Sequence, residues 1–120
     1  MSIRIQGVAI AALDPRALGR WWSEALGWPT TFEEGDDFIV VSPADSDQSD
    51  LVFLKVPDAK VVKNRLHLEL MPDDQDAEVA RFEALGATRV DIGQGPDVSW
   101  VVLADREGNE FCILRPDDEG

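Results

Sequence analysis

The single histidine and the single cysteine are the residues of this 120-residue chain whose side chains best suit chemistry. An imidazole can move a proton near neutral pH, and beside a thiol it can generate a nucleophilic thiolate. His67 stands between two leucines, so it could as well be a hydrogen-bonded residue of the core or of a cavity wall as a catalytic residue. Cys112, between Phe111 and Ile113, is most simply a small buried apolar residue. One thiol excludes a disulfide framework or a cysteine-built zinc site within this chain.

Two glutamates accompany these residues at strand spacing. Side chains of a strand alternate between its two faces, so Glu69 shares the face of His67, and Glu110 shares the face of Cys112. A carboxylate beside an imidazole suits acid–base chemistry, which makes His67 and Glu110 the candidate catalytic residues. The carboxylates could equally form a polar wall. The sequence has no serine-nucleophile motif and no phosphate-binding glycine loop.

The charge of the chain limits its partners. Eleven basic and 24 acidic residues give a net charge of −13, which repels phosphate backbones and anionic lipid surfaces. We therefore expect no nucleic-acid partner and no membrane partner. A basic cluster, Lys55, Lys60, Lys63 and Arg65, holds four of the eleven bases. It could face an anionic ligand, but charge clusters are usually solvated surface, and that interpretation is favoured.

The aromatic residues suit a binding site better than a reaction. Four Trp and five Phe without any Tyr give large flat surfaces and few aromatic hydroxyls. Trp21 or Trp22 must pack a helix onto its sheet, whereas Trp28 and Trp100 are predicted on strands and are the candidates for stacking on a ligand. With the surplus of carboxylates, this favours a planar cationic or amine-bearing ligand.

The size and hydropathy of the chain predict one domain, residues 1–120, with its own core: 44% of the residues are hydrophobic. The longest strongly apolar stretches, such as residues 98–104, are far shorter than the roughly 20 residues that span a bilayer. The N-terminal residues lack the apolar run of a signal peptide. We therefore expect a cytoplasmic protein.

An internal repeat divides the chain. The tetrapeptide EALG at 24–27 recurs at 83–86, an offset of 59 residues. Each copy closes a predicted helix that follows an acidic cap, Asp14 in the first half and Asp73 or Asp74 in the second, and each ends in a glycine suited to a left-handed stop. One strand is predicted before each helix and three after it. The predicted strands are 3–12, 28–32, 38–41 and 51–56, then 65–71, 88–92, 99–104 and 111–114.

Each half is therefore β-α-β-β-β, and three segments of the second half carry a family resemblance: 63–68 (KNRLHL), 77–87 (AEVARFEALGA) and 100–111 (WVVLADREGNEF). In order and spacing they resemble the small glyoxalase-like branch of the vicinal oxygen chelate superfamily, the glyoxalase, bleomycin-resistance and extradiol-dioxygenase group. The resemblance covers the whole chain. It implies an α+β fold of two tandem modules, about 1–56 and 64–116, whose curled mixed sheets surround a shared cleft. It also implies a homodimer, or else a closed monomer.

The resemblance also bears on metal binding. Metal-using members take one ligand from the first strand and one from the last strand of each module. The first-strand positions, counted from the capping aspartates, fall on Gly7 and His67, and the last-strand positions fall on Cys112 and, 60 residues earlier, on Val52. Two of the four positions lack a donor, so we expect no metal cofactor. If a divalent metal does bind, its ligands would be His67, Glu69, Glu110 and Cys112.

Three functions are compatible with these residues. The first is a metal-independent protein that binds a small aromatic or amine-bearing compound in the cleft, as bleomycin-resistance relatives sequester a drug. The second is an enzyme of lyase, isomerase or dioxygenase type, with a displaced metal or with acid–base chemistry by His67. The third is a scaffold module without a ligand. The residues expected to line the cleft are His67, Glu69, Trp100, Glu110 and Cys112, with Asn64 and Arg65 near its rim.

Overall fold

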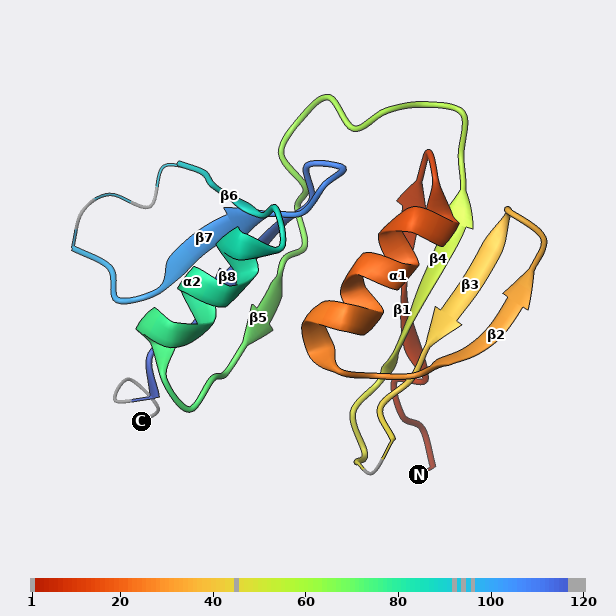
Figure 1. Ribbon diagram of the computed structural model, residues 1–120, viewed down its shortest axis with the longest axis horizontal. Coiled ribbons are helices and arrows are strands. Elements are labelled where there is room, and N and C mark those ends of the chain that lie inside the picture. The colour runs from red at the N-terminus through yellow and green to blue at the C-terminus, as the bar shows by residue number, and fades with distance from the viewer. Residues whose placement is uncertain (1, 45, 92, 94, 96, 117–120) are drawn as a thin grey trace. The chain divides into compact units, whose positions relative to one another are not determined.

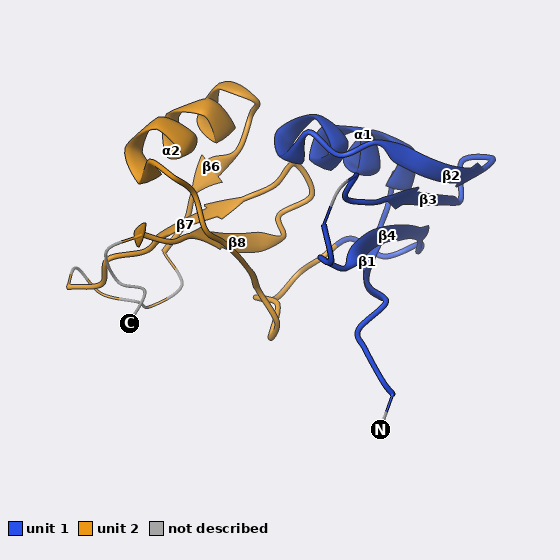
Figure 2. Ribbon diagram, turned by 90° about the horizontal axis from the view of Figure 1, so that it is seen from below, with its two compact units in different colours: residues 1–59 blue, residues 60–120 orange. Residues whose placement is uncertain are grey.

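Both halves of the chain fold into the same order of elements, a strand, a helix and three strands (Figure 1). The computed structural model describes residues 2–44, 46–91, 93, 95 and 97–116. The chain divides into two compact units, Met1–Ala59 and Lys60–Gly120, shown in two colours in Figure 2. The division falls inside the segment expected to join the modules. That both units belong to one domain stays a prediction.

The first unit is a four-stranded sheet with one helix on it. Its strands run in the order β1-β4-β3-β2, with β1 and β4 parallel and the other pairs antiparallel. Helix α1 packs on β3 and β4 and covers the buried side chains of Ile39 and Phe53. The elements are β1 (Gly7–Ala12), α1 (Pro15–Leu26), β2 (Thr30–Glu34), β3 (Phe38–Val41) and β4 (Asp50–Lys55).

The second unit repeats this plan with shorter strands. Its order is β5-β8-β7-β6, and again the first and last strands of the unit, β5 and β8, are parallel. Helix α2 packs on β8, where the rings of Phe82 and Phe111 lie 5.4 Å apart. The elements are β5 (Leu68–Leu70), α2 (Gln75–Ala84), β6 (Thr88–Arg89), β7 (Val101–Ala104) and β8 (Glu110–Ile113).

The two parallel pairs have the same register. Ala9 lies opposite Val52 in the first unit, and Glu69 lies opposite Cys112 in the second. Both residues of the second pair follow their counterparts by 60 positions, as Asp74 follows Asp14. The repeat seen in the sequence therefore corresponds to equivalent positions in the two sheets.

The helices begin as predicted. Asp14 and Asp74 are the N-caps, and each carboxylate accepts a hydrogen bond of 3.1 Å from the backbone N–H three residues later. Helix α1 ends at Gly27 with φ of 69°, the left-handed conformation expected there. Helix α2 is capped by Leu85, and Gly86 follows it with φ of 107°. The choice between Asp73 and Asp74 is thereby settled in favour of Asp74.

Several predicted strand boundaries were wrong. Trp28 is not in β2, because Pro29 lacks the N–H that a ladder needs, and the strand begins at Thr30. Trp100 lies in a bend before β7 rather than on that strand. His67 precedes β5, which begins at Leu68. The predicted end of β6, Ile92, lies outside the described residues.

The predicted fold class is confirmed. Two helices and eight strands form two mixed four-stranded sheets, an α+β arrangement rather than one parallel sheet, among the described residues. Neither helix in this part of the chain has the length and apolar character needed to cross a membrane.

The close packing of α1 on its sheet generates the first testable prediction. A Cβ atom on Gly19 would lie 2.5 Å from Cγ2 of the buried Ile39, far inside contact distance. We expect Gly19→Ala to lower the free energy of unfolding by about 1 to 3 kcal/mol. In an exposed helix the same change would be favourable by about 1 kcal/mol, so the sign of the effect reports on the contact. Urea denaturation measures it.

The matched control is the same change in an Ile39→Ala background. Ile39→Ala removes the atom that the new methyl group would meet, so Gly19→Ala should then cost less, and the two changes should not be additive. An equal or higher stability of Gly19→Ala in the wild-type background would contradict this account of the helix packing.

Candidate functional site

One face of the second sheet carries three of the residues singled out above, Glu69, Glu110 and Cys112. Phe111 of β8 contacts α2 through its ring, so alternation turns Glu110 and Cys112 to the opposite face. Glu69 lies opposite Cys112 in the parallel pair and shares that face, as Val102 of β7 does across the antiparallel pair. We call the residues Glu69, Val102, Glu110 and Cys112 the polar face of the second sheet.

Cys112 is buried, and its environment keeps the thiol protonated. Burial raises the pKa of the Cys112 thiol, and the neighbouring negative charge of Glu69 raises this pKa further. Both effects disfavour the thiolate, which is the reactive form. The geometry therefore favours the role of a small buried apolar residue over that of a nucleophile.

His67 presents a buried nitrogen without a hydrogen bond. It stands immediately before β5, and its Nε2 atom is shielded from solvent with no partner among the described residues. Leaving a buried polar atom unpaired typically costs about 1 to 3 kcal/mol, so such atoms call for an explanation. A ligand atom that binds this nitrogen would supply one.

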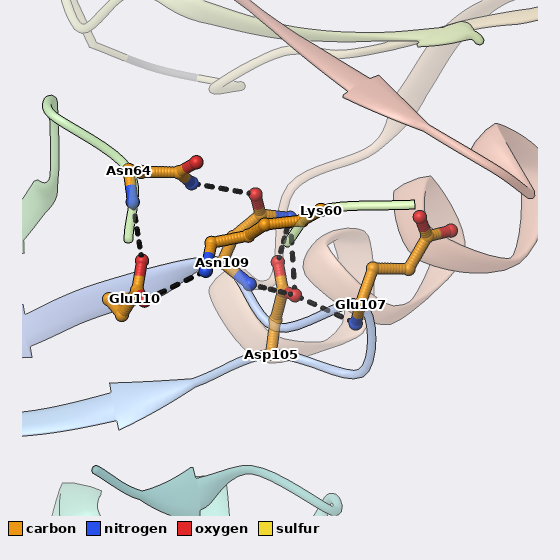
Figure 3. A network of polar contacts seen from close by, with 6 residues as sticks. All are labelled: Lys60, Asn64, Asp105, Glu107, Asn109 and Glu110. Carbon is orange, nitrogen blue, oxygen red and sulfur yellow. Dashed lines mark hydrogen bonds and ion pairs between the residues drawn. The ribbon is translucent and has the colours of Figure 1, made fainter. Parts of the chain in front are cut away.

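Glu110 is held by groups from the segment that precedes His67 (Figure 3). Lys60 Nζ lies 2.9 Å from Oε2 of Glu110, and the backbone N–H of Asn64 donates to Oε1 at 3.2 Å. Both charged side chains are partly buried. We call Lys60, Asn64 and Glu110 the clamp, because they fix residues 60–64 against the start of β8. Each oxygen of this carboxylate is thus already engaged.

The turn between β7 and β8 supports the clamp. Asp105 is buried, and its Oδ1 accepts from the backbone N–H groups of Glu107 and Asn109. Asn109 in turn donates through Nδ2 to Asp105 and accepts from Nδ2 of Asn64 at 2.9 Å. These contacts form one network in Figure 3. Sequence reasoning identified the turn but missed the roles of Lys60, Asp105 and Asn109.

The clamp lowers the pKa of the Glu110 carboxyl. Burial alone would raise this pKa, but the hydrogen bonds from Lys60 and from the Asn64 backbone outweigh it. Glu110 is therefore ionised at neutral pH and does not act as a general acid. A group that is already paired with an ammonium is also a weaker partner for a further cation.

The remaining predicted residues are placed differently. Asn64 belongs to the clamp, and Arg65 is exposed. Trp100 is 38% exposed, in a bend where strand alternation does not fix the direction of the ring. The carbonyl of Ser99, its neighbour, accepts from Nε2 of Gln75 at 2.8 Å, and the same amide donates to the carbonyl of Ile113. Gln75, the first residue of α2, thus ties the segment before Trp100 to β8.

The positions that correspond to the metal ligands of metal-using members offer few free donors in this chain. In the first unit, a Cβ on Gly7 would lie 3.6 Å from Cγ2 of Val52, so these two positions are neighbours and neither offers a donor atom. In the second unit, the oxygens of Glu110 are engaged by the clamp. No three His, Cys, Asp or Glu side chains gather as metal ligands in the described part of the chain, and His67, Glu69, Glu110 and Cys112 form no such group.

The clamp predicts that the contribution of Glu110 to the stability of the fold depends on pH. Because the pKa of Glu110 is lowered in the folded state, its contribution to stability is complete above the unfolded carboxyl pKa of about 4.3. That contribution is lost as the pH falls through the lower folded pKa. We expect Glu110→Gln to destabilise the protein at neutral pH, and the difference from wild type to shrink in acid. Urea denaturation across this pH range checks it.

A double-mutant cycle separates the pair from its surroundings. Lys60→Met combined with Glu110→Gln should give a coupling energy of about 1 kcal/mol or more at neutral pH. The exposed ion pair Glu78–Arg81 of α2, with 2.8 Å between its charged atoms, is the control and should give no more than about 0.5 kcal/mol. Equal coupling energies in the two pairs would show that the Lys60–Glu110 pair contributes no more than an exposed ion pair does.

Comparison with known proteins agrees with this architecture. Residues 7–114 match the family model described as "Glyoxalase-like domain". No curated protein matches the chain. A bleomycin-binding protein from Streptomyces verticillus, solved with copper(II)-bleomycin, is 18% identical with a TM-score of 0.66, covering 96% of this chain and 98% of the other.

Two further structures are similar. The antibiotic binding protein TnmS3 from Streptomyces sp. CB03234 is 22% identical with a TM-score of 0.70, over 97% of this chain and 98% of the other. The fosfomycin resistance protein FosX from Listeria monocytogenes, an E126Q mutant solved with Mn(II), is 12% identical with a TM-score of 0.75, over 95% and 90%. At these identities the likeness concerns the fold. From the match over residues 7–114, the chain belongs to the glyoxalase-like domain family.

Proposed function

We propose that this protein binds a small organic molecule that carries an aromatic body and an amine, and that it does so without a metal ion. The family and the two structural relatives named for binding an antibiotic support a small-molecule ligand. The binding residues in this proposal are Glu69, Cys112 and His67, with Trp100 as a stacking surface.

The observation that carries the proposal is the position of Glu69 on the polar face of the second sheet. Its carboxylate is exposed, whereas its neighbour in the register, Cys112, and the next residue across the sheet, Val102, are buried. An exposed carboxylate above buried apolar side chains can pair with the cationic amine of such a ligand. The net charge of −13 attracts such a cation over a longer range.

Glu110 has another task in this proposal. Since the clamp engages both of its oxygens, it holds residues 60–64 in place and does not contact the ligand. Asn64 acts with it, and Arg65, which is exposed, lies outside the binding residues. Trp100 keeps its proposed role because its ring is partly exposed and the segment before it is anchored by Gln75.

A second candidate function is acid–base catalysis by His67. It is favoured by one observation, the buried and unpaired Nε2 atom, since a nitrogen without a protein partner can exchange a proton with a bound substrate. Glu110 is unsuited to be the second catalytic group because it is paired with Lys60. A catalyst would therefore use His67 alone or with Glu69.

A ligand screen tests the proposal. Planar aromatic amines are added to the protein and binding is followed by tryptophan fluorescence, then by calorimetry. For the amine that binds best, Glu69→Gln should weaken affinity by about tenfold or more, because it removes the charge opposite the amine. Trp100→Ala should have an effect of similar size if the ring stacks on the aromatic body.

The matched control is Glu34→Gln, which removes the same charge from an exposed glutamate of β2 in the first unit. It should leave the affinity nearly unchanged. A ligand whose affinity responds neither to Glu69→Gln nor to Trp100→Ala would rule out this site. Turnover of the bound compound that His67→Ala abolishes would instead favour the catalytic function.

Metal analysis gives an independent prediction. Protein purified without a chelator should contain well under one Ni²⁺, Mn²⁺, Fe²⁺ or Zn²⁺ ion per chain, because the positions at Gly7 and Val52 supply no donor. It should form no lactoylglutathione, and added chelator should not change the affinity for the amine. About one metal per chain, lost in His67→Ala together with activity, would contradict metal independence.

A further inference from the structure

The strand ladder starts at different points in the two units. In the first unit, the parallel pair begins with Gly7 opposite Asp50. In the second unit it begins one residue later, with Leu68 opposite Phe111. His67, the residue equivalent to Gly7, thus lies outside the ladder. Strand pairing therefore holds the chain after His67 but not His67 itself.

The chain before His67 has no regular structure of its own. Residues 56–67 are all described, and none of them belongs to a helix or a strand. Such a segment keeps the conformational freedom of a loop unless other contacts remove it. The order of His67 on its N-terminal side must therefore come from contacts outside the helices and strands.

The clamp supplies these contacts (Figure 3). Lys60 Nζ lies 2.9 Å from Oε2 of Glu110, and the two side chains are only 19% and 10% exposed. The backbone N–H of Asn64 donates to the other oxygen of the same carboxylate at 3.2 Å. Residues 65–67 alone then separate Asn64 from the ladder at Leu68. Because both ends of this short span are fixed to adjacent residues of β8, the span has little freedom to move.

The equivalent position of the first unit carries a different contact. Asp50, the residue equivalent to Glu110, accepts an exposed hydrogen bond of 3.4 Å from Nε2 of Gln6. This contact precedes Gly7, which has no side chain to orient. The shielded ion pair of the second unit precedes a residue that can bind a ligand.

We propose that Lys60 is a positioning residue for His67. Its ammonium holds Glu110, this carboxylate holds the backbone of Asn64, and the short span that follows places the imidazole with its Nε2 atom unpaired and shielded from solvent. A nitrogen held in this way binds a polar atom of a ligand with little further loss of conformational entropy. The inference rests on the proposed function, since it assigns Lys60 a role in the affinity of that same site.

Nuclear magnetic resonance tests the positioning without a ligand, because the chain holds a single histidine. In protein labelled with ¹³C-histidine, the ring of His67 should give one set of signals, shifted from those of free histidine. Lys60→Met should broaden these signals or move them toward free histidine, while the Trp indole signals show that the variant is folded. Lys60→Arg keeps a cation for Glu110 and should restore the signals of the wild type. Should Lys60→Met not fold, Lys60→Gln keeps a hydrogen-bond donor without the charge and should shift the signals in the same direction.

Benzylamine, an aromatic compound with a cationic amine, is the probe for binding. Its titration is followed through the same ring signals. Lys60→Met should raise the dissociation constant by about threefold or more, because the site must then be ordered on binding, and Lys60→Arg should leave it near the wild-type value. The matched control is Gln6→Met, which removes the equivalent hydrogen bond of the first unit and should change neither the ring signals nor the affinity.

Four results would overturn the proposal. The first is a set of ring signals that Lys60→Met leaves unchanged, and the second is an equal change in Gln6→Met. The third is a Lys60→Arg variant that behaves as Lys60→Met does, since the ion pair would then not be the cause. The fourth is altered ring signals with an unaltered affinity for benzylamine. If the wild type does not bind benzylamine, that result counts against the proposed function, and the ring signals of the ligand-free protein still decide the positioning.

Discussion

The parallel pairing of the first and last strands of each unit is the constraint on which the candidate site depends. A parallel pair cannot be closed by a short turn, so the helix and two further strands must lie between its members. In return, the pairing brings together residues that are more than forty positions apart in the sequence. Glu69 meets Cys112 in this way, and Ala9 meets Val52 at the equivalent positions. The pair formed by β5 and β8 thus places Glu69 beside Cys112 in the candidate site.

The same scaffold carries different chemistry in its two copies. In the first unit, the position equivalent to His67 is Gly7, and a Cβ there would lie 3.2 Å from the carbonyl oxygen of Asp50. A larger residue would therefore have to displace a neighbouring backbone. The missing donor is thus built into the packing of β1 against β4. Of the positions equivalent to His67, Glu69, Glu110 and Cys112, Gly7, Ala9 and Val52 carry no side-chain donor, and Asp50 is the acidic residue of the set. This difference between the copies favours a site with one charged side and no symmetric set of ligands.

The parts of the fold that could be predicted are those specified locally. The caps Asp14 and Asp74 and the stop at Gly27 depend on residues within one helical turn, and all three behave as their chemistry predicts. Strand alternation also placed Glu110 on the face of Cys112, because that pattern has a period of two. That Glu69 shares this face depends on the pairing of β5 with β8. The position of Trp100 was wrong, because a strand boundary is set by pairing with distant residues.

Glu110 shows why the type and the face of a residue do not determine its role. Glu69 and Glu110 both belong to the polar face of the second sheet. Of the two, Glu110 is the one that accepts hydrogen bonds from the Lys60 ammonium group and from the Asn64 backbone N–H. Those partners lie 50 and 46 positions away, in a segment without regular secondary structure, so no local pattern could indicate them. Removing one glutamate from solvent in this way leaves the other as the exposed carboxylate of that face. The same ion pair fixes the segment that follows Lys60. One interaction therefore orders the backbone that leads to His67 of the proposed binding site.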